Sequence, residues 1–267
     1  MSDRVLLTDA ALLALTVLMS AGCVPSEPSP SADGGVTAVA ARPMNTGPKP
    51  SSPPQMPRVQ APLPTVAPSA GPPITSVFED HFDRAELGPD WFAAGPGWSI
   101  KNGRLCGQGA RNRGVWLERT LPLNARIEFD AMSESPDGDI KAEYWGDGHS
   151  GATSVSYTNA TSYLTIFGGW KNQFHVLARV NEHAPDRLQI RVDPSSTREQ
   201  DRPVIPGRTY GFRVERADGK TISWWVDGNL MHRLDDPQPL SGPGHDHFGF
   251  NDWEVPVCFD NVKITPL

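Results

Sequence analysis

Short segments of alternating polar and apolar residues, separated by turn signals, constrain the fold of this chain most strongly. Residues 125–131 (ARIEFDA) place isoleucine and phenylalanine on one face and charged side chains on the other. Residues 210–216 (YGFRVER) repeat the pattern, and Asp-Gly at 218–219 follows as a hairpin turn signal. We find no segment that combines a helix cap with a 3.6-residue period. Many short strands joined by tight turns predict an all-β, two-sheet antiparallel jelly-roll sandwich over residues 74–267.

The first 23 residues are typical of an export signal. An apolar run over residues 10–19 suits the core of a signal peptide and is too short to span a bilayer. Ser-Ala-Gly-Cys at residues 20–23 is similar to a bacterial lipobox, in which the cysteine, here Cys23, is lipidated. A plain secretory signal with a chance cysteine is the alternative. With Val24 next, the pattern favours a lipoprotein of the bacterial cell envelope, in the outer membrane, that meets the membrane only through its lipid.

A sharp change of composition separates this signal from the predicted domain. Residues 24–73 consist mainly of Pro, Ser, Ala, Gly and Thr, as in PSEPSP at residues 25–30. Such a segment cannot bury a core and stays extended, partly as polyproline II. We therefore predict a disordered tether that holds the domain away from the membrane surface.

The charge balance argues against nucleic acid as a partner. The 267 residues include 24 Lys and Arg against 31 Asp and Glu, a formal net charge of −7 at pH 7. The basic residues form no long stripe, whereas binding to phosphate groups requires clustered Lys and Arg.

Two cysteines remain in the predicted domain, Cys106 in an early strand and Cys258 in a late one. Export to an oxidising compartment permits a disulfide between them. The first and last strands of jelly rolls often lie side by side, which would bring the two residues together. Two buried free thiols are the alternative, and the predicted compartment favours the disulfide.

Several short motifs resemble concanavalin A-like, laminin-G-like bacterial domains. They are FEDHFD at 78–83, WSIKNGRL at 98–105, the hairpin at 222–228 and FDNVKI at 259–264, and the likeness covers nearly all of residues 74–267. Such domains occur in glycan-binding modules, family-16 glycoside hydrolases, keto-disaccharide hydrolase-like proteins and alginate-lyase-like proteins. The resemblance therefore implies a carbohydrate ligand, although short motifs support a fold better than an activity.

One motif of that family provides a test for an enzyme. Family-16 hydrolases resemble one another in a Glu-x-Asp-x-(x)-Glu strand, which places a nucleophile and an acid on one face. Residues 128–134 (EFDAMSE) and 137–143 (DGDIKAE) space their acids differently, which argues against that chemistry. If the chain is an enzyme, Glu118 with Glu143 would serve a glycoside hydrolase, and His175 a polysaccharide lyase.

Aromatic and polar residues gather in several stretches and predict a glycan-binding concave face. Aromatic rings stack on the C–H faces of sugars, while polar side chains hydrogen-bond the hydroxyls. In the predicted strand after Asn172, we expect His175 and Arg179 to look outward and Val176 and Ala178 to face the core. A solvated sheet face without a ligand is the alternative. The predicted ligand-binding residues are Trp116, Glu118, Glu143, Trp145, Tyr157, Asn172, His175, Arg179, Asn251 and Trp253.

The closing strand contains a candidate calcium ligand. Asp260 resembles the calcium-binding aspartate of family-16 and related jelly rolls. By that resemblance, the other ligands would be the main-chain carbonyls of Glu79 or Asp80 and of Gly103. Oxygen ligands suit Ca²⁺, whose role here would be structural. A carboxylate that caps a backbone amide is the alternative.

These features together predict a cell-envelope lipoprotein with a glycan-binding concanavalin A-like domain. A glycoside hydrolase or polysaccharide lyase with an atypical site is the alternative, and a structural adhesion module is the second. A flat aromatic face without paired carboxylates favours binding. A concave face that is filled by loops or apolar side chains favours the adhesion module.

Overall fold

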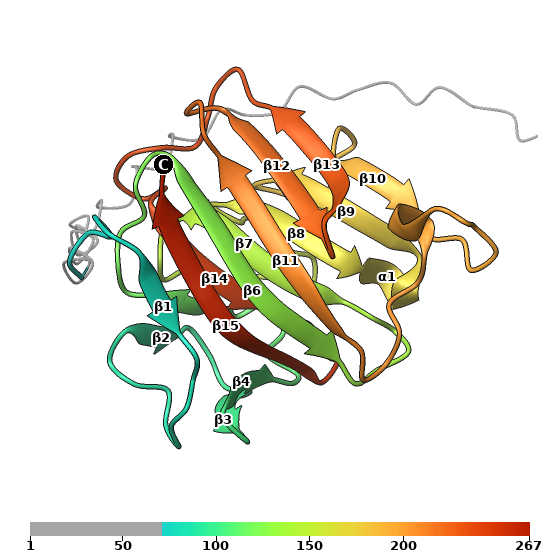
Figure 1. Cartoon of the computed structure of the whole chain (residues 1–267), viewed down its shortest axis with the longest axis horizontal. Coiled ribbons are helices and arrows are strands. Elements are labelled where there is room, and N and C mark those ends of the chain that lie inside the picture. Colours follow the sequence, from blue (N-terminus) through green and yellow to red (C-terminus); the bar gives the residue numbers. More distant parts are fainter. Residues whose placement is uncertain (1–70) are drawn as a thin grey trace, which may run out of the picture. The chain divides into compact units, whose positions relative to one another are not determined.

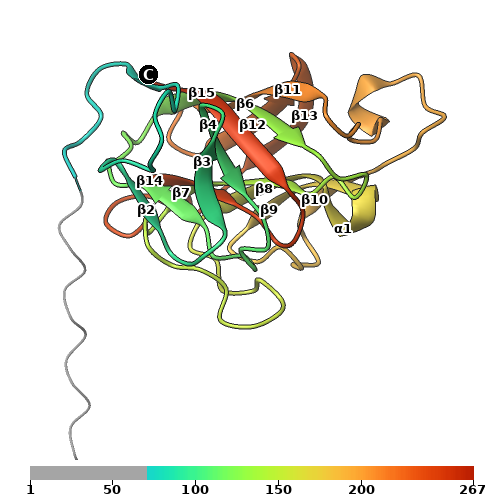
Figure 2. The ribbon, with the colours of Figure 1, turned by 90° about the horizontal axis from the view of Figure 1, so that it is seen from below.

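The computed structural model describes residues 71–267, which form two antiparallel sheets packed face to face (Figures 1 and 2). This confirms the predicted all-β sandwich. The predicted signal segment with Cys23, and the tether as far as residue 70, lie outside the described residues. No helix within residues 71–267 has the length and apolar character needed to cross a membrane.

The first sheet has eight strands and joins the two ends of the domain. Its order is β13-β12-β11-β6-β15-β4-β3, and β1 pairs with β15, so the opening strand lies beside the closing one. The strands are β1 (Phe78–Asp80), β3 (Trp98–Lys101), β4 (Arg104–Gly107), β6 (Ala125–Ser133), β11 (Thr209–Arg216), β12 (Thr221–Val226), β13 (Asn229–Asp235) and β15 (Val257–Pro266).

The second sheet has seven strands in the order β10-β9-β8-β7-β14-β5-β2. A short helical turn, α1 (Gly169–Asn172), connects β8 to β9, and a 3-10 turn, η1 (Glu199–Asp201), follows β10. The strands are β2 (Trp91–Ala93), β5 (Val115–Leu117), β7 (Ile140–Gly146), β8 (Tyr163–Gly168), β9 (Phe174–Arg179), β10 (Leu188–Arg191) and β14 (His247–Asn251).

The inner faces of the two sheets share one apolar core. Burial alternates strictly along β6, with Ile127 and Phe129 inside, as the sequence predicts. The Phe129 ring stacks on Phe212 of β11 at 4.9 Å between centroids and meets Phe250 of the other sheet edge to face at 5.1 Å. Because burying each such ring contributes roughly 1.5–3 kcal/mol, these contacts hold the sheets together.

The outer faces of the two sheets differ. Every residue of β7 and β14 is buried, so the seven-stranded sheet is covered on its outer face as well as its inner one. Part of the cover is the loop of residues 147–162, which connects β7 to β8 and which Figure 2 shows below this sheet. We call this loop the cover loop.

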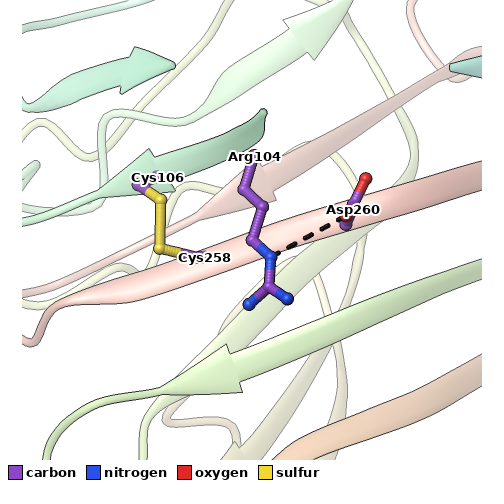
Figure 3. The surroundings of a disulfide bond; sticks show 4 residues. All are labelled: Arg104, Cys106, Cys258 and Asp260. Carbon is purple, nitrogen blue, oxygen red and sulfur yellow. Dashed lines mark ion pairs between the residues drawn. A yellow bond between two sulfur atoms is a disulfide. The ribbon is translucent and has the colours of Figure 1, made fainter. Parts of the chain in front are cut away.

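The two cysteines of the domain form a disulfide (Figure 3). Cys106 of β4 and Cys258 of β15 lie directly opposite each other in register, with 4.1 Å between their Cα atoms. The bond closes a loop with a sequence separation of 152 residues. By the chain-entropy model, closing so long a loop stabilises the fold by about 4–5 kcal/mol.

Candidate functional site

An apolar patch lies on the outer face of the seven-stranded sheet, beneath the cover loop. Leu164 and Ile166 of β8 and Val176 and Ala178 of β9 point away from the main core and form a second cluster. Tyr157 and Ala160 of the cover loop complete this cluster, and all six side chains are buried. The cover loop is therefore packed onto β8 and β9, and no ligand reaches the sheet there in this conformation.

A buried carboxylate anchors the cover loop to β7. Glu143 accepts hydrogen bonds from the Tyr157 hydroxyl at 3.0 Å, the Ser162 hydroxyl at 2.6 Å and the Asn251 amide. Burial raises the pKa of Glu143 to about 7, although these three donors favour the charged form. Glu143 is fully enclosed, so its oxygen atoms are occupied by the protein itself.

The Trp116 ring lies beside this anchor and is also fully buried. The ring packs directly on Gly146 of β7 and Gly249 of β14. A Cβ atom added at these glycines would lie 2.6 Å and 2.8 Å from the ring, so a larger residue would not fit. The indole N–H donates to the Ser150 carbonyl of the cover loop at 2.9 Å. Trp116 therefore serves packing in this conformation.

An open groove of about 540 Å³ lies next to the covered patch. Residues of α1 and β9 line one side of the groove. Residues of the connection from β14 to β15 line the other side, and β7 lies between β9 and β14 in the sheet order. Its lining residues are Asp137, Asp139, Lys141, Val155, Ser156, Trp170, Lys171, Gln173, Phe174, Glu182, His183, Arg187, Trp253, Glu254 and Val255.

A left-handed turn presents Trp170 to the groove. Trp170, Lys171 and Asn172 have φ values of 53°, 59° and 60°, a conformation that is costly for residues other than glycine. The Asn172 side chain fixes the turn, because its amide donates to the Val204 carbonyl at 2.8 Å and its oxygen accepts from the Val204 N–H at 3.0 Å. The Arg187 guanidinium lies over the Trp170 ring, 4.2 Å from its centre.

The floor of the groove is a buried ion cluster. The Lys141 ammonium lies 3.1 Å from Glu182 Oε2, 3.1 Å from Asn112 Oδ1 and 3.8 Å from Asp139 Oδ1. Burial alone would lower the pKa of Lys141, but Asp139 and Glu182 outweigh it and raise the pKa. Burial raises the pKa of Asp139, against the effect of Lys141. The three charged side chains of the cluster are therefore buried at the base of an open groove.

The structure corrects the predicted face of β9. His175 and Leu177 point between the two sheets, where the His175 ring stacks on Phe167 at 4.3 Å, and Val176 lies on the outer face. The His175 nitrogens contact the Gly168 N–H and the Arg202 carbonyl, each at 3.0 Å. Burial lowers its pKa to about 4. The prediction that His175 faces outward is wrong, and its role as a ligand or a base stays a prediction that its burial between the sheets disfavours.

The other predicted ligand-binding residues lie in the groove, beneath the cover loop, or elsewhere in the domain. Trp253 lines the groove, whereas Trp116, Glu143, Tyr157 and Asn251 lie together beneath the cover loop. One predicted residue thus lines the groove and four lie in the closed part of the face, while their predicted roles in binding stay predictions.

Four predicted residues lie elsewhere, and three of them make contacts that stabilise the fold. Arg179 pairs with Asp236 at 2.8 Å, and Asn172 binds main-chain groups. Trp145 is buried under the Arg216 guanidinium, 3.9 Å away. Their predicted direct roles in binding stay predictions, and these contacts give each side chain a structural role. Glu118 is exposed beyond the end of β5, and no hydrogen bond or ion pair among the described residues joins it to Glu143.

The groove residues that were not predicted include Trp170, Asp139, Lys141 and Glu182. A signal for two of them was present in residues 139–143 (DIKAE), since alternate residues of a strand share one face. Glu182 gave no such signal, because it reaches Lys141 from a connection 41 residues away.

The predicted calcium site stays a prediction. Asp260 lies on β15 with Arg104 Nε at 3.8 Å (Figure 3), and burial, followed by Asp130 and Asp83, raises its pKa. This local surplus of acid fits a cation, whereas Arg104 competes for the same carboxylate. Within residues 71–267 no group of three or more His, Cys, Asp or Glu side chains could hold a metal ion. The predicted site does not need one, because two of its ligands are main-chain carbonyls.

Comparisons with known proteins give likenesses of fold alone. No protein-family model and no curated protein matches the chain significantly. It is similar to the carbohydrate binding module CBM66 from Bacillus subtilis, with 14% identity over 67% of this chain and 98% of that one, at a TM-score of 0.48. It is also similar to a Bacillus licheniformis beta-glucanase (10% identity, 73% and 100% covered, TM-score 0.49) and to a laminarinase from Flavobacterium sp. (12%, 71% and 99%, 0.49).

The strand pairing and the groove of this chain define its class. It is a two-sheet antiparallel jelly-roll sandwich whose seven-stranded sheet has an outer face that is partly closed and partly open.

Proposed function

We propose that this chain is a carbohydrate-binding protein of the cell envelope, tethered by a lipid at Cys23 and without catalytic activity. The observation that carries the proposal is the open groove in which Trp170 and Trp253 border the buried floor of Asp139, Lys141 and Glu182. Indole rings stack on the C–H faces of sugars, and the charged floor offers hydrogen-bonding groups to hydroxyls.

The size of the groove supports binding of an oligosaccharide segment. A volume of about 540 Å³ falls within the range of ligand-binding clefts. The open groove also argues against a structural adhesion module. The cover loop does fill part of the outer face, as that alternative requires, but the groove beside it stays open.

The same geometry argues against hydrolysis by the predicted pair Glu118 and Glu143 and against lyase chemistry by His175. A hydrolase needs two carboxylates that act on the substrate from solvent-accessible positions. Glu143 is sealed by three donors, and Glu182 is held by the Lys141 ammonium. A lyase based on His175 would need a base that the substrate can reach, and His175 points between the sheets.

A glycan array tests the proposal directly. The probe is the full chain with Cys23→Ala, which prevents lipidation. We expect binding to at least one class of glycan, with release of no products. Trp170→Ala or Trp253→Ala should weaken that binding about tenfold or more, because buried aromatic contacts dominate such sites.

The matched control is Trp225→Ala, since Trp225 lies on β12 of the other sheet, half-buried under the Arg213 guanidinium at 4.0 Å. This variant should bind as the parent does. A chain that binds no glycan, or groove variants that bind as well as the control, would contradict the proposal. Shortened products from any bound glycan would instead establish an enzyme.

A further inference from the structure

One carboxylate in the groove lacks the partners that buried carboxylates ordinarily have. Asp139 lines the groove and is 9% exposed. Among residues 71–267 its side chain accepts no hydrogen bond, and its one ion pair is with the Lys141 ammonium at 3.8 Å. Lys141 is engaged more closely by Glu182 and Asn112, each at 3.1 Å. Asp139 therefore keeps free acceptor positions that face the groove.

The other buried carboxylates of the domain show what is missing. Glu143 has three side-chain donors, and Asp236 accepts from the Tyr163 hydroxyl, the Arg179 guanidinium and the Gln238 N–H at 2.7 to 2.9 Å. Leaving a buried charged acceptor unpaired costs more than leaving a neutral one unpaired. Asp252 also has one unpaired oxygen, but its other oxygen accepts from the Ala110 N–H at 2.9 Å. Asp139 differs because its side chain accepts no hydrogen bond among residues 71–267, and it lines the groove.

The charges around Asp139 indicate which kind of hydrogen-bond donor a ligand would bring to this carboxylate. Lys141 is the cation that acts on this carboxylate, whereas Glu182, Asp137 and Glu254 act with the same sign as Asp139 itself. The groove lining holds four acidic residues, Asp137, Asp139, Glu182 and Glu254, against the three basic residues Lys141, Lys171 and Arg187, so a small excess of negative charge disfavours anionic sugars such as uronates and sulfated glycans. It attracts a cation to Asp139, whereas the Trp170 and Trp253 rings each already have an arginine over one face, Arg187 at 4.2 Å and Arg111 at 4.7 Å.

We propose that the groove recognises a saccharide that carries a protonated amine, with the ammonium group against Asp139. This inference rests on the proposed carbohydrate-binding function and names its ligand class, a hexosamine with a free amino group. The ammonium supplies up to three donors and one positive charge to the unpartnered carboxylate. An N-acetylated sugar of the same length keeps the ring faces but loses the charge.

The experiment compares two oligosaccharides that differ only in this group. Calorimetry with the full chain carrying Cys23→Ala measures the affinity for a glucosamine tetramer and for the N-acetylglucosamine tetramer, at a pH where the amine is protonated. We expect the free amine to bind about tenfold more tightly or better. Asp139→Asn should abolish that preference. Glu86→Gln, which makes the same charge change at an exposed residue outside the groove, should keep it.

A second measurement needs no variant and so does not depend on the folding of Asp139→Asn. Raising the salt concentration should weaken binding of the glucosamine tetramer to the parent chain and leave the acetylated tetramer nearly unaffected. Equal binding of the two tetramers, or tighter binding of a neutral or uronate oligosaccharide in the same groove, overturns the amine inference and leaves the proposed function standing. Failure of every glycan to bind overturns both.

Discussion

The outer faces of the two sheets behave in opposite ways. On the eight-stranded sheet, β6 alternates between buried and half-buried residues, so its outer face is polar and meets solvent. On the seven-stranded sheet, β7 is buried at every position and its outer face holds an anchor, an apolar patch and an ion cluster. The outer face of the seven-stranded sheet is therefore partly buried under the cover loop and partly open as the groove.

The largest effect that distinguishes the two faces should come from their tryptophans. Trp116→Ala removes a fully buried ring from the outer face of the seven-stranded sheet, and we expect a loss of about 3–5 kcal/mol in unfolding free energy. Trp225→Ala, on the outer face of the other sheet, should cost about 1 kcal/mol or less, because that ring is half-buried. Urea unfolding measures both variants. Equal losses would show that the two faces are not different.

The next effect concerns the anchor beneath the cover loop. The pKa of Glu143 is about 7 in the folded chain against a usual value of 4.5. Between these values the folded chain holds a proton that the unfolded chain has released. The contribution of Glu143 to stability is therefore fully present below pH 4.5 and falls by roughly 3 kcal/mol as the pH rises through 7.

Glu143→Gln should lack this fall, since glutamine does not titrate. Denaturant unfolding of parent and variant from pH 4.5 to 8 isolates the effect, because the titration of Asp252, His175 and the other groups is common to both chains. Stability curves that stay parallel over this range would show that Glu143 is not the buried group described here.

The smallest effect belongs to the eight-stranded sheet. If Asp260 binds Ca²⁺ with main-chain carbonyls, millimolar calcium should raise the melting temperature by a few degrees, the mass-action result of binding to the folded state. Asp260→Asn should abolish the rise, whereas Glu86→Gln should preserve it. A calcium effect that persists in Asp260→Asn would place the ion elsewhere.

The direction of side chains was predicted better for the eight-stranded sheet, whose outer face meets solvent, than for the seven-stranded sheet, whose outer face is covered. In β6 the alternation assigns Ile127 and Phe129 correctly, because water on one side keeps polar residues there. In β9 both faces are buried, so the apolar residues Val176 and Leu177 do not show which face lies between the two sheets. His175 was therefore assigned to the outer face, although it lies on the inner one. Alternation alone cannot tell a core from a covered face.

The site was predictable only where a local pattern carried it. Trp253, predicted because it follows a clear strand, lines the groove. The disulfide of Cys106 and Cys258 is confirmed, because an early and a late strand were expected to be neighbours. The cover loop was not foreseen, since it depends on Tyr157 reaching Glu143 of β7, which the sequence predicts as a ligand-binding residue and not as an anchor for a loop. Glu182 was missed for the same reason, as its contact with Lys141 exists only in the folded chain.

The central claim is that the open part of the covered face, and no other surface, binds the sugar. Labelled indole N–H signals in a nuclear magnetic resonance titration test it, because the chain has eight Trp residues and each gives one signal. On addition of a glycan that binds, the signals of Trp170 and Trp253 should shift while that of Trp225 stays in place. A shift of Trp225 without those two would contradict the account.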